Sequence, residues 1–407
     1  MWAATDRPPD RSPPPEPDQH DPLSVIPSLR WDIFCRVVDN YGDGGVCWRL
    51  ARQLAAEHGL AVTLWIDDVA SLAHIEPLLD PRRDDQVACS VRVRRSGDSR
   101  PVAFLNPDVV IEAFGCGLPD AYRDAMAGEP RPPVWVNLEY LSAEAWVESA
   151  HALPSPHPRL PLTCWFYFPG FTASTGGLLR EDGLSETRDA FRHDTGASDT
   201  LWRSIGVEPA SSGLNISLFC YANSALPALL DAWSEGDEEI VCVVPEGVAQ
   251  AELDRWTGGA VPHPGKPTKR GRLTVAVAKF MDQDAFDRRL WACDLNFVRG
   301  EDSLVRALWA EQPMVWHIYP QAESVHLLKL DALLTRYEAG LDPMAALAQR
   351  VFWQAWNSGH PEATVAAWPS FRSALPVLGK RGRAWAHALT RQADLTMGLV
   401  TFCENRL

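Results

Sequence analysis

The sequence contains no apolar run of about eighteen residues, the length from which a membrane-spanning helix is predicted. Its first residues lack the basic and then apolar order of a secretory signal. Its nine cysteines are scattered and form no C-x-x-C pair. An odd, scattered set of cysteines is typical of reduced, mostly buried thiols. We therefore expect a cytoplasmic protein that neither spans nor binds a membrane.

Excess positive charge is also missing. The chain has 53 acidic and 38 Lys and Arg residues, and its formal net charge is −15. This balance argues against direct binding of nucleic acid and is compatible with a basic protein partner. The length of 407 residues and the hydrophobic content of 46% predict two α/β domains with sizeable cores.

Short apolar runs alternate with helical patterns, which is typical of doubly wound parallel sheets. The first sheet is predicted from runs at 33–38, 60–66, 87–93, 108–114 and 134–138, and the second from runs at 214–221, 239–244, 273–277 and 294–298. Residues 178–205 and the chain beyond residue 324 have helical patterns, whereas 154–161 and 258–272 are rich in loop-forming residues. Two successive α/β sheets of similar size are typical of GT-B glycosyltransferases, with two Rossmann-like domains facing a central cleft.

The composition also suggests domain boundaries. Residues 1–28 carry clustered prolines and are expected to be a disordered leader. We predict an N-terminal Rossmann-like domain over 29–205, a C-terminal Rossmann-like domain over 206–380, and a final helical segment over 381–407 that packs back toward the N-terminal domain.

Two carboxylates mark the first candidate site. Asp39 and Asp43 follow the strand predicted at 33–38, and Gly42, Gly44 and Gly45 lie beside them, before a helix expected from Val46. Ligands of open α/β sheets bind at this carboxyl end. The glycines match neither a Rossmann fingerprint nor a P-loop. The two acids either cap turns or form a general base with an orienting partner, and the spacing is compatible with both.

A second candidate site lies where the strand at 294–298 ends. A helix is expected to open at Asp302 and Ser303, either of which suits an N-cap, and free N–H groups in its first turn would bind an anion. Arg299 could bind phosphate, or it could pair with Glu301. The acidic side chains are expected to point away from a diphosphate, toward ribose hydroxyls.

Other residues have two interpretations each. Aromatic residues near strand ends could sandwich a base, with Gln283 contacting its edge, or could pack in the core; they are Phe219, Tyr221 and Phe280. Asp282-Gln283-Asp284 matches a D-x-D metal motif, but its acidic residues at the start of a helix are explained by complementing the helix dipole, which we favour over metal binding. His317 and His326 are expected to be structural. The Thr175-Gly176-Gly177 loop either faces the cleft or forms an aromatic-plugged turn.

Five stretches resemble one family, the bacterial arginine rhamnosyltransferases known as EarP. They are VVDNYGD at 37–43, IEAFGCGLP at 111–119, NLEYLSAE at 137–144, FPGFT with TGGLLRE within 168–181, and LNFVRGEDS with HIYPQ within 295–321. The resemblance runs from about Trp31 to the C-terminal helices. Position 44 departs from it, because Gly44 stands where the family usually has isoleucine.

The resemblance implies an enzyme of GT-B fold that transfers L-rhamnose from dTDP-β-L-rhamnose to an arginine of translation elongation factor P, with inversion and without a metal or other cofactor. It implies that the N-terminal domain binds the acceptor protein and the C-terminal domain the nucleotide sugar. It assigns catalysis to Asp43 as general base, with Asp39 and Glu301. Donor contacts would come from Phe219, Tyr221, Phe280, Gln283, Arg299, Asp302 and Ser303. Candidates for gripping the acceptor are Glu112, Glu139 and Tyr140, at strand ends of the N-terminal domain.

Two other functions fit the same residues. A GT-B glycosyltransferase with another acceptor would share the donor site, so only a screen of acceptors would distinguish it from an enzyme that modifies elongation factor P. A non-catalytic dTDP-sugar-binding protein would bind dTDP and transfer nothing to any arginine.

Overall fold

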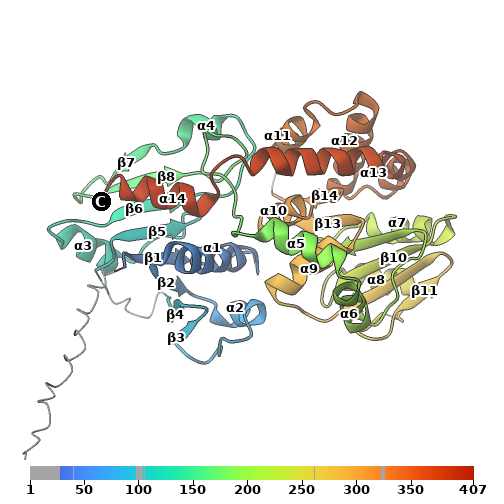
Figure 1. The fold of residues 1–407 in the computed structure, drawn as a ribbon, viewed down its shortest axis with the longest axis horizontal. Coiled ribbons are helices and arrows are strands. Elements are labelled where there is room, and N and C mark those ends of the chain that lie inside the picture. The colour runs from blue at the N-terminus through green and yellow to red at the C-terminus, as the bar shows by residue number, and fades with distance from the viewer. Residues whose placement is uncertain (1–27, 40, 98–103, 105, 261, 322–325) are drawn as a thin grey trace, which may run out of the picture.

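A computed structural model describes residues 28–39, 41–97, 104, 106–260, 262–321 and 326–407. Residues 1–27 of the predicted leader lie outside the described residues. Figure 1 shows two lobes, each built on its own sheet, which lie end to end along the long axis of the molecule. Among the described residues, no helix combines the length and the apolar character needed to cross a bilayer.

The first sheet has eight strands in the order β3-β4-β2-β1-β5-β6-β8-β7. The edge strands β3 and β7 run antiparallel to their neighbours, and the inner pairs run parallel. The central strands β2, β1, β5 and β6 are buried along almost their whole length because helices cover the sheet. Its strands are β1 (Arg30–Cys35), β2 (Ala61–Ile66), β3 (Asp85–Ala88), β4 (Val91–Arg95), β5 (Val109–Ala113), β6 (Val134–Leu138), β7 (Pro154–Pro156) and β8 (Thr163–Tyr167), and its helices are α1 (Gly42–His58), α2 (Val69–Ile75), α3 (Asp120–Gly128) and α4 (Trp146–Ala150).

The second sheet has six strands in the order β11-β12-β10-β9-β13-β14, and only the pair β11–β12 is antiparallel. Its strands are β9 (Leu214–Leu218), β10 (Ile240–Pro245), β11 (Thr268–Arg270), β12 (Leu273–Ala278), β13 (Leu295–Arg299) and β14 (Met314–His317). Its helices are α7 (Leu226–Glu235), α8 (Gln250–Thr257), α9 (Gln283–Ala292) and α10 (Asp302–Trp309). Each parallel crossover therefore brings the carboxyl ends of the strands to one edge, as the doubly wound pattern predicts.

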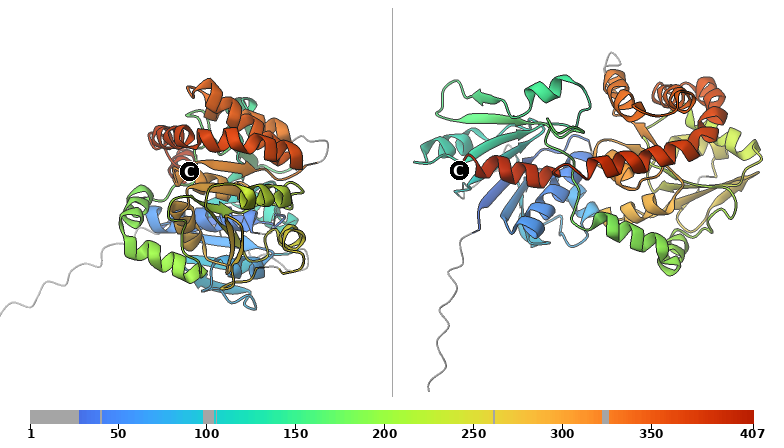
Figure 2. Two further views of the ribbon diagram at one scale, coloured as in Figure 1. Left: turned by 90° about the vertical axis from the view of Figure 1, so that its right-hand side faces the viewer. Right: turned by 45° about the horizontal axis from the view of Figure 1, so that its top comes forward.

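Six helices connect and cover the two sheets. They are α5 (Leu184–His193), α6 (Thr195–Ile205), α11 (His326–Glu338), α12 (Pro343–Asn357), α13 (Pro361–Leu389) and α14 (Leu395–Glu404). Trp353 and Trp356 of α12 are fully buried against the second sheet. The final segment predicted over 381–407 begins inside α13. The right-hand view of Figure 2 shows the red C-terminal helices α13 and α14 running from the second lobe to the first, and Leu395 and Leu399 join the core of the first sheet.

Several local predictions were wrong, each at a turn. The strand predicted over 87–93 is the hairpin of β3 and β4, because Cys89 and Ser90 adopt positive φ and reverse the chain. The proline-rich stretch contains the edge strand β7, where a missing N–H costs no sheet bond. The loop predicted over 258–272 contains β11. The segment 178–183 lies before α5 and is not helical.

The Thr175–Gly177 loop does not face the cleft. A Cβ atom at Gly176 would lie 2.2 Å from the ring of Tyr167, and one at Gly177, where φ is +76°, would lie 2.4 Å from the carbonyl oxygen of Ala393. The glycines therefore allow this loop to pack on β8 and on the segment before α14. It is an aromatic-plugged turn, the second of the two interpretations.

Helix α1 begins at Gly42, four residues before the predicted start. The carboxylate of Asp43 explains the early start, because its Oδ2 atom accepts hydrogen bonds from the N–H groups of Val38 (2.8 Å) and Asp39 (2.9 Å). These bonds fold the preceding loop onto the first turn of the helix, so that Gly44 and Gly45 are helical residues.

The glycines at 44 and 45 form a matched pair for mutation. A Cβ atom at 44 would meet only Ile66 (3.6 Å) and Val37 (3.8 Å), at ordinary contact distance. One at 45 would lie 3.2 Å from Nε2 of Gln283, on the opposite lobe. We expect Gly44→Ala to stabilise the fold by roughly 0.4–1 kcal/mol and Gly45→Ala to destabilise it by roughly 1–3 kcal/mol. Urea unfolding checks both values, and a destabilising Gly44→Ala would contradict the helical assignment of this turn.

Candidate active site

Two cavities lie between the lobes, at the carboxyl ends of both sheets. The first, of about 380 Å³, is lined by residues 39, 41, 42, 49 and 75 of the first lobe and by residues 219, 245–248, 280–283, 286, 289 and 299–303 of the second. The second, of about 260 Å³, is lined by residues 38, 39, 42, 43, 46, 114, 140, 141, 300, 301, 316, 318, 319, 321 and 329. Asp39, Gly42, Gly300 and Glu301 line both. A molecule in either cavity therefore contacts the same small group of residues.

Asp43 lines the second cavity, and its two carboxylate oxygens have different hydrogen-bond partners. Its side chain is 3% exposed. Oδ2 accepts from the two backbone N–H groups that fold the loop onto α1, whereas among the described residues Oδ1 accepts only from the hydroxyl of Tyr140, at 3.2 Å. Burial, together with Asp43 and Glu301, raises the pKa of Tyr140 above its ordinary value, so that its hydroxyl remains a donor. Oδ1 is thus the atom at which Asp43 can accept a further proton.

Asp39 joins the two lobes. Its Oδ2 atom accepts a 2.7 Å hydrogen bond from the hydroxyl of Tyr221, which follows β9 of the second sheet. Tyr221 is absent from the linings of both cavities. Its aromatic ring instead contacts His317 and Tyr319 at 5.5 and 5.3 Å between centroids. The structure therefore gives Tyr221 a role in positioning Asp39.

Glu301 lies at the junction of the two cavities, half-buried at the start of α10. Burial, and to a lesser extent the nearby Asp43 and Asp39, raises its pKa to about 8, although a 2.7 Å hydrogen bond from the N–H of Leu141 acts in the opposite direction. At neutral pH this carboxyl group is mostly protonated. A cation entering the second cavity would favour its ionised form.

Arg299 is held at the end of β13 by two aromatic rings. Its guanidinium carbon lies 4.5 Å from the ring centroid of Phe219 and 4.7 Å from that of Tyr221. Its Nη1 atom donates to the carbonyl oxygen of Cys220 at 3.4 Å, and among the described residues it forms no ion pair, so the pairing with Glu301 considered from the sequence does not form. The positive charge remains available to a ligand in the first cavity, which Arg299 lines.

The prediction that Asp302 or Ser303 is the N-cap residue of α10 was wrong. The N-cap residue is Glu301, which makes no side-chain cap bond, and the Ser303 hydroxyl donates to the carbonyl of Arg299. The N–H groups of the first turn are therefore not satisfied by the capping residue, as an anion site requires. Asp302 points away from this turn and pairs with Arg49 of α1, with 3.0 Å between Nε and Oδ1.

Gln283 and Phe280 both line the first cavity but are bound to the opposite lobe. Nε2 of Gln283 donates to the carbonyl of Gly45 at 3.0 Å, while Oε1 is buried without a partner among the described residues. The ring of Phe280 is 40% exposed and contacts Tyr41 and His74 at 5.0 and 5.7 Å between centroids. A ligand that contacts these residues would touch both lobes.

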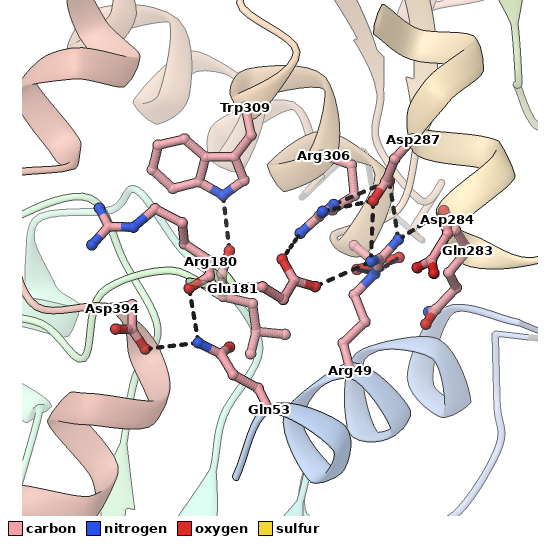
Figure 3. A network of polar contacts seen from close by, with 12 residues as sticks. Arg49, Gln53, Arg180, Glu181, Gln283, Asp284, Asp287, Arg306, Trp309 and Asp394 are labelled. Carbon is pink, nitrogen blue, oxygen red and sulfur yellow. Dashed lines mark hydrogen bonds and ion pairs between the residues drawn. The ribbon is translucent and has the colours of Figure 1, made fainter. Parts of the chain in front are cut away.

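A buried ion network that the sequence did not reveal joins the lobes; we call it the Arg49 network, and it comprises Arg49, Glu181, Asp287, Asp302 and Arg306. Figure 3 shows Arg49 reaching from α1 toward Asp287 of α9 and Glu181 of the segment before α5. Arg49 binds Asp287 at 3.1 Å and Glu181 at 3.3 Å, and Arg306 binds the same two acids at 2.6 Å. Burial raises the pKa of Glu181, but Arg306 and Arg49 outweigh it and lower that pKa to about 2. Glu181 therefore stays ionised in the neutral range, whereas burial raises the pKa of Asp287 in spite of the two arginines.

The three acceptor candidates occupy different places. Tyr140 lines the second cavity and stacks on Phe114, with 4.4 Å between centroids and 12° between planes. Glu112 is buried and accepts from the N–H of Gly117 (2.8 Å) and the indole of Trp135 (3.1 Å). Glu139 accepts from Asn137, and burial raises its pKa. Neither glutamate lines the two cavities.

Asp282, Asp284 and His326 have structural partners, whereas the Nδ1 atom of His317 is buried without a hydrogen-bond partner among the described residues. Asp282 caps α9 by accepting from the N–H of Ala285 at 2.7 Å, and Asp284 pairs with Arg52 at 3.7 Å. Burial lowers the pKa of His317 to about 3, and His326 accepts from the N–H of Gln321. No group of three or more His, Cys, Asp or Glu in the described part of the chain could hold a metal ion.

Comparison with known proteins identifies the family. A family model described as "Elongation-Factor P (EF-P) rhamnosyltransferase EarP" matches residues 31–404. The chain belongs to this EarP family. Two relatives named "Protein-arginine rhamnosyltransferase" are each 48% identical, over 380 residues in Pseudomonas putida (93% of this chain, 99% of the relative) and over 373 residues in Pseudomonas aeruginosa (91% and 98%). The predicted family is confirmed.

A solved structure supports the fold assignment. It is described as "Structural basis for EarP-mediated arginine glycosylation of translation elongation factor EF-P" and is 37% identical to this chain, with a TM-score of 0.67 over 93% of this chain and 100% of the other. The predicted GT-B fold and glycosyltransferase class are confirmed. Within this EarP family member, the Arg49 network and the Tyr221–Asp39 bond are the site features that sequence reasoning missed.

The raised pKa of Glu301 makes a testable prediction for stability. Between its unfolded pKa of about 4.3 and its folded pKa of about 8, the folded state binds a proton that the unfolded state has released. This contribution to stability is present below the unfolded pKa and is lost as pH rises through the folded pKa. Glu301→Gln removes it and keeps an acceptor for Leu141. We expect the melting temperature of the variant relative to wild type to increase from pH 5.5 to pH 9. A constant difference over this range would contradict the raised pKa.

Proposed function

We propose that this protein transfers L-rhamnose from dTDP-β-L-rhamnose to one arginine side chain of translation elongation factor P, with inversion at the anomeric carbon. We further propose that the reaction takes place in the cytosol, where this factor works. The family and its named relatives support this reaction. The observation that carries the mechanism is the junction of two cavities at Asp39, Gly42, Gly300 and Glu301. One cavity is suited to a donor and the other to an acceptor.

The first cavity has the features that a nucleoside diphosphate requires. Arg299 brings an unpaired positive charge, and α10 begins there with N–H groups that its cap residue leaves unsatisfied. Charge-assisted hydrogen bonds from both would stabilise the negative charge that grows on the departing dTDP. In this proposal they do the work that a metal does in other glycosyltransferases, so no metal or other cofactor takes part.

The second cavity is suited to a guanidinium group. Its polar walls are the carboxylates Asp39, Asp43 and Glu301, and the stacked pair Phe114–Tyr140 provides an aromatic side. A guanidinium is a poor nucleophile because it is protonated and its lone pairs are delocalised. Carboxylates hydrogen-bonded to it can orient one nitrogen and localise its electrons.

Asp43 is the proposed general base. Its Oδ2 atom is fixed by two N–H groups, so Oδ1 stays aimed into the second cavity and can accept the proton that the arginine nitrogen loses as the C–N bond forms. Attack from this cavity on a sugar held in the first cavity places the nucleophile and the departing diphosphate on opposite faces of the anomeric carbon. That arrangement gives inversion.

Intact-mass spectrometry of elongation factor P from the source organism tests the reaction. After incubation with the enzyme and dTDP-β-L-rhamnose, we expect a gain of one deoxyhexose, and no gain when the acceptor arginine is changed to lysine. Asp43→Asn should lower the transfer rate roughly 10²–10⁴-fold with dTDP affinity retained, whereas Arg299→Ala should weaken dTDP binding about tenfold or more.

Three results would count against parts of the proposal. Swapped phenotypes of the two variants would overturn the roles of Asp43 and Arg299. Normal dTDP binding with no mass gain on the factor would favour another acceptor or a non-catalytic binder. Transfer that stops after treatment with a chelator would contradict the metal-independent mechanism.

A further inference from the structure

Arg289 is a buried cation without a partner. It lies in α9, its side chain is 0% exposed, and none of its three guanidinium nitrogens has a hydrogen-bond partner among the described residues. Its closest recorded contact is the ring of Phe286, 4.8 Å from the guanidinium carbon. Burial lowers its pKa to about 10, which still leaves the group protonated at neutral pH.

A buried guanidinium destabilises the folded protein unless a ligand provides hydrogen-bond acceptors for it. A guanidinium carries five N–H donors, and an unpaired charge removed from water destabilises a folded protein strongly. The other buried arginines of this region, Arg49 and Arg306, are each paired with two or more carboxylates. Arg289 lines the first cavity, so a bound molecule can supply what the chain does not.

Arg289 and Arg299 line the same cavity but contact different aromatic rings. The ring of Phe286, which Arg289 contacts, lies 5.6 Å from that of Phe219, and Phe219 in turn contacts Arg299. A chain of contacts through two aromatic rings therefore leads from Arg289 to Arg299. In the proposed function Arg299 and the start of α10 bind the diphosphate, which leaves Arg289 for a different part of the same ligand.

We propose that Arg289 recognises the pyrimidine base of the donor, by donating hydrogen bonds to a base carbonyl oxygen; this inference rests on the proposed dTDP-sugar donor. Thymine presents keto oxygens and no charge, so it accepts hydrogen bonds from a cation that is remote from the diphosphate. Phe286 lines the cavity beside Arg289 and offers an apolar surface to the base. Arg289 is a binding residue that determines the choice of nucleotide.

Calorimetry with dTDP and with pyrophosphate tests this role. Arg289→Met should raise the dissociation constant of dTDP roughly 10- to 100-fold, the effect of a hydrogen bond to a charged group, and leave that of pyrophosphate unchanged. The ligand-free variant should melt no lower than wild type, because an unpaired buried charge has been replaced by an apolar side chain. Arg288→Met, at the exposed neighbouring position on α9, is the control and should change neither ligand.

The outcomes separate the proposals. Equal weakening of dTDP and pyrophosphate would place Arg289 at the phosphates and overturn the inference. Unchanged dTDP binding, or a strongly lowered melting temperature with normal dTDP affinity, would make the residue structural and also overturn it. Wild-type protein that binds pyrophosphate but not dTDP would instead refute the proposed donor.

Discussion

The Arg49 network is the interaction on which the arrangement of the site depends. It buries two arginines and three carboxylates drawn from α1, from the segment before α5, and from α9 and α10. Burying charges costs desolvation energy that close pairing repays only in part. The network therefore contributes more to how α1 lies against α9 and α10 than to stability. It brings the carboxyl ends of both sheets together.

That arrangement explains the properties of the individual site residues. Asp39 belongs to the first lobe and is bonded to Tyr221 of the second, and Glu301 belongs to the second and accepts from Leu141 of the first. Each acid is thus held by the opposite lobe. Exclusion of water between the lobes raises the pKa of Glu301, and the same exclusion strengthens any hydrogen bond to a ligand there. The contact between the lobes therefore accounts both for the positions of Asp39 and Glu301 and for the raised pKa of Glu301.

The sequence predicted the central strands well because buried parallel strands are nearly continuous apolar runs. It failed at the β3–β4 turn, where two non-glycine residues adopt positive φ. Asp39, Asp43 and Arg299 could be proposed from their places after strands. The partners of Asp302, Tyr221 and Gln283 could not, since each lies more than 180 residues away in the chain and depends on how the lobes meet. The isolation of Arg289 is likewise a property of the folded core.

A distance measurement between the lobes tests the central claim most directly. Spin labels at the exposed Cys89 and at Met344→Cys, whose native side chain is 73% exposed, report on the two lobes. The account predicts one narrow distance distribution for wild type and for Arg52→Met, which removes only the exposed 3.7 Å pair with Asp284. It predicts a longer and broader distribution for Arg49→Met, because this variant removes the ion pairs of α1 with Asp287 and Asp302 of the second lobe. An unchanged distribution in Arg49→Met would show that the network does not hold the lobes together.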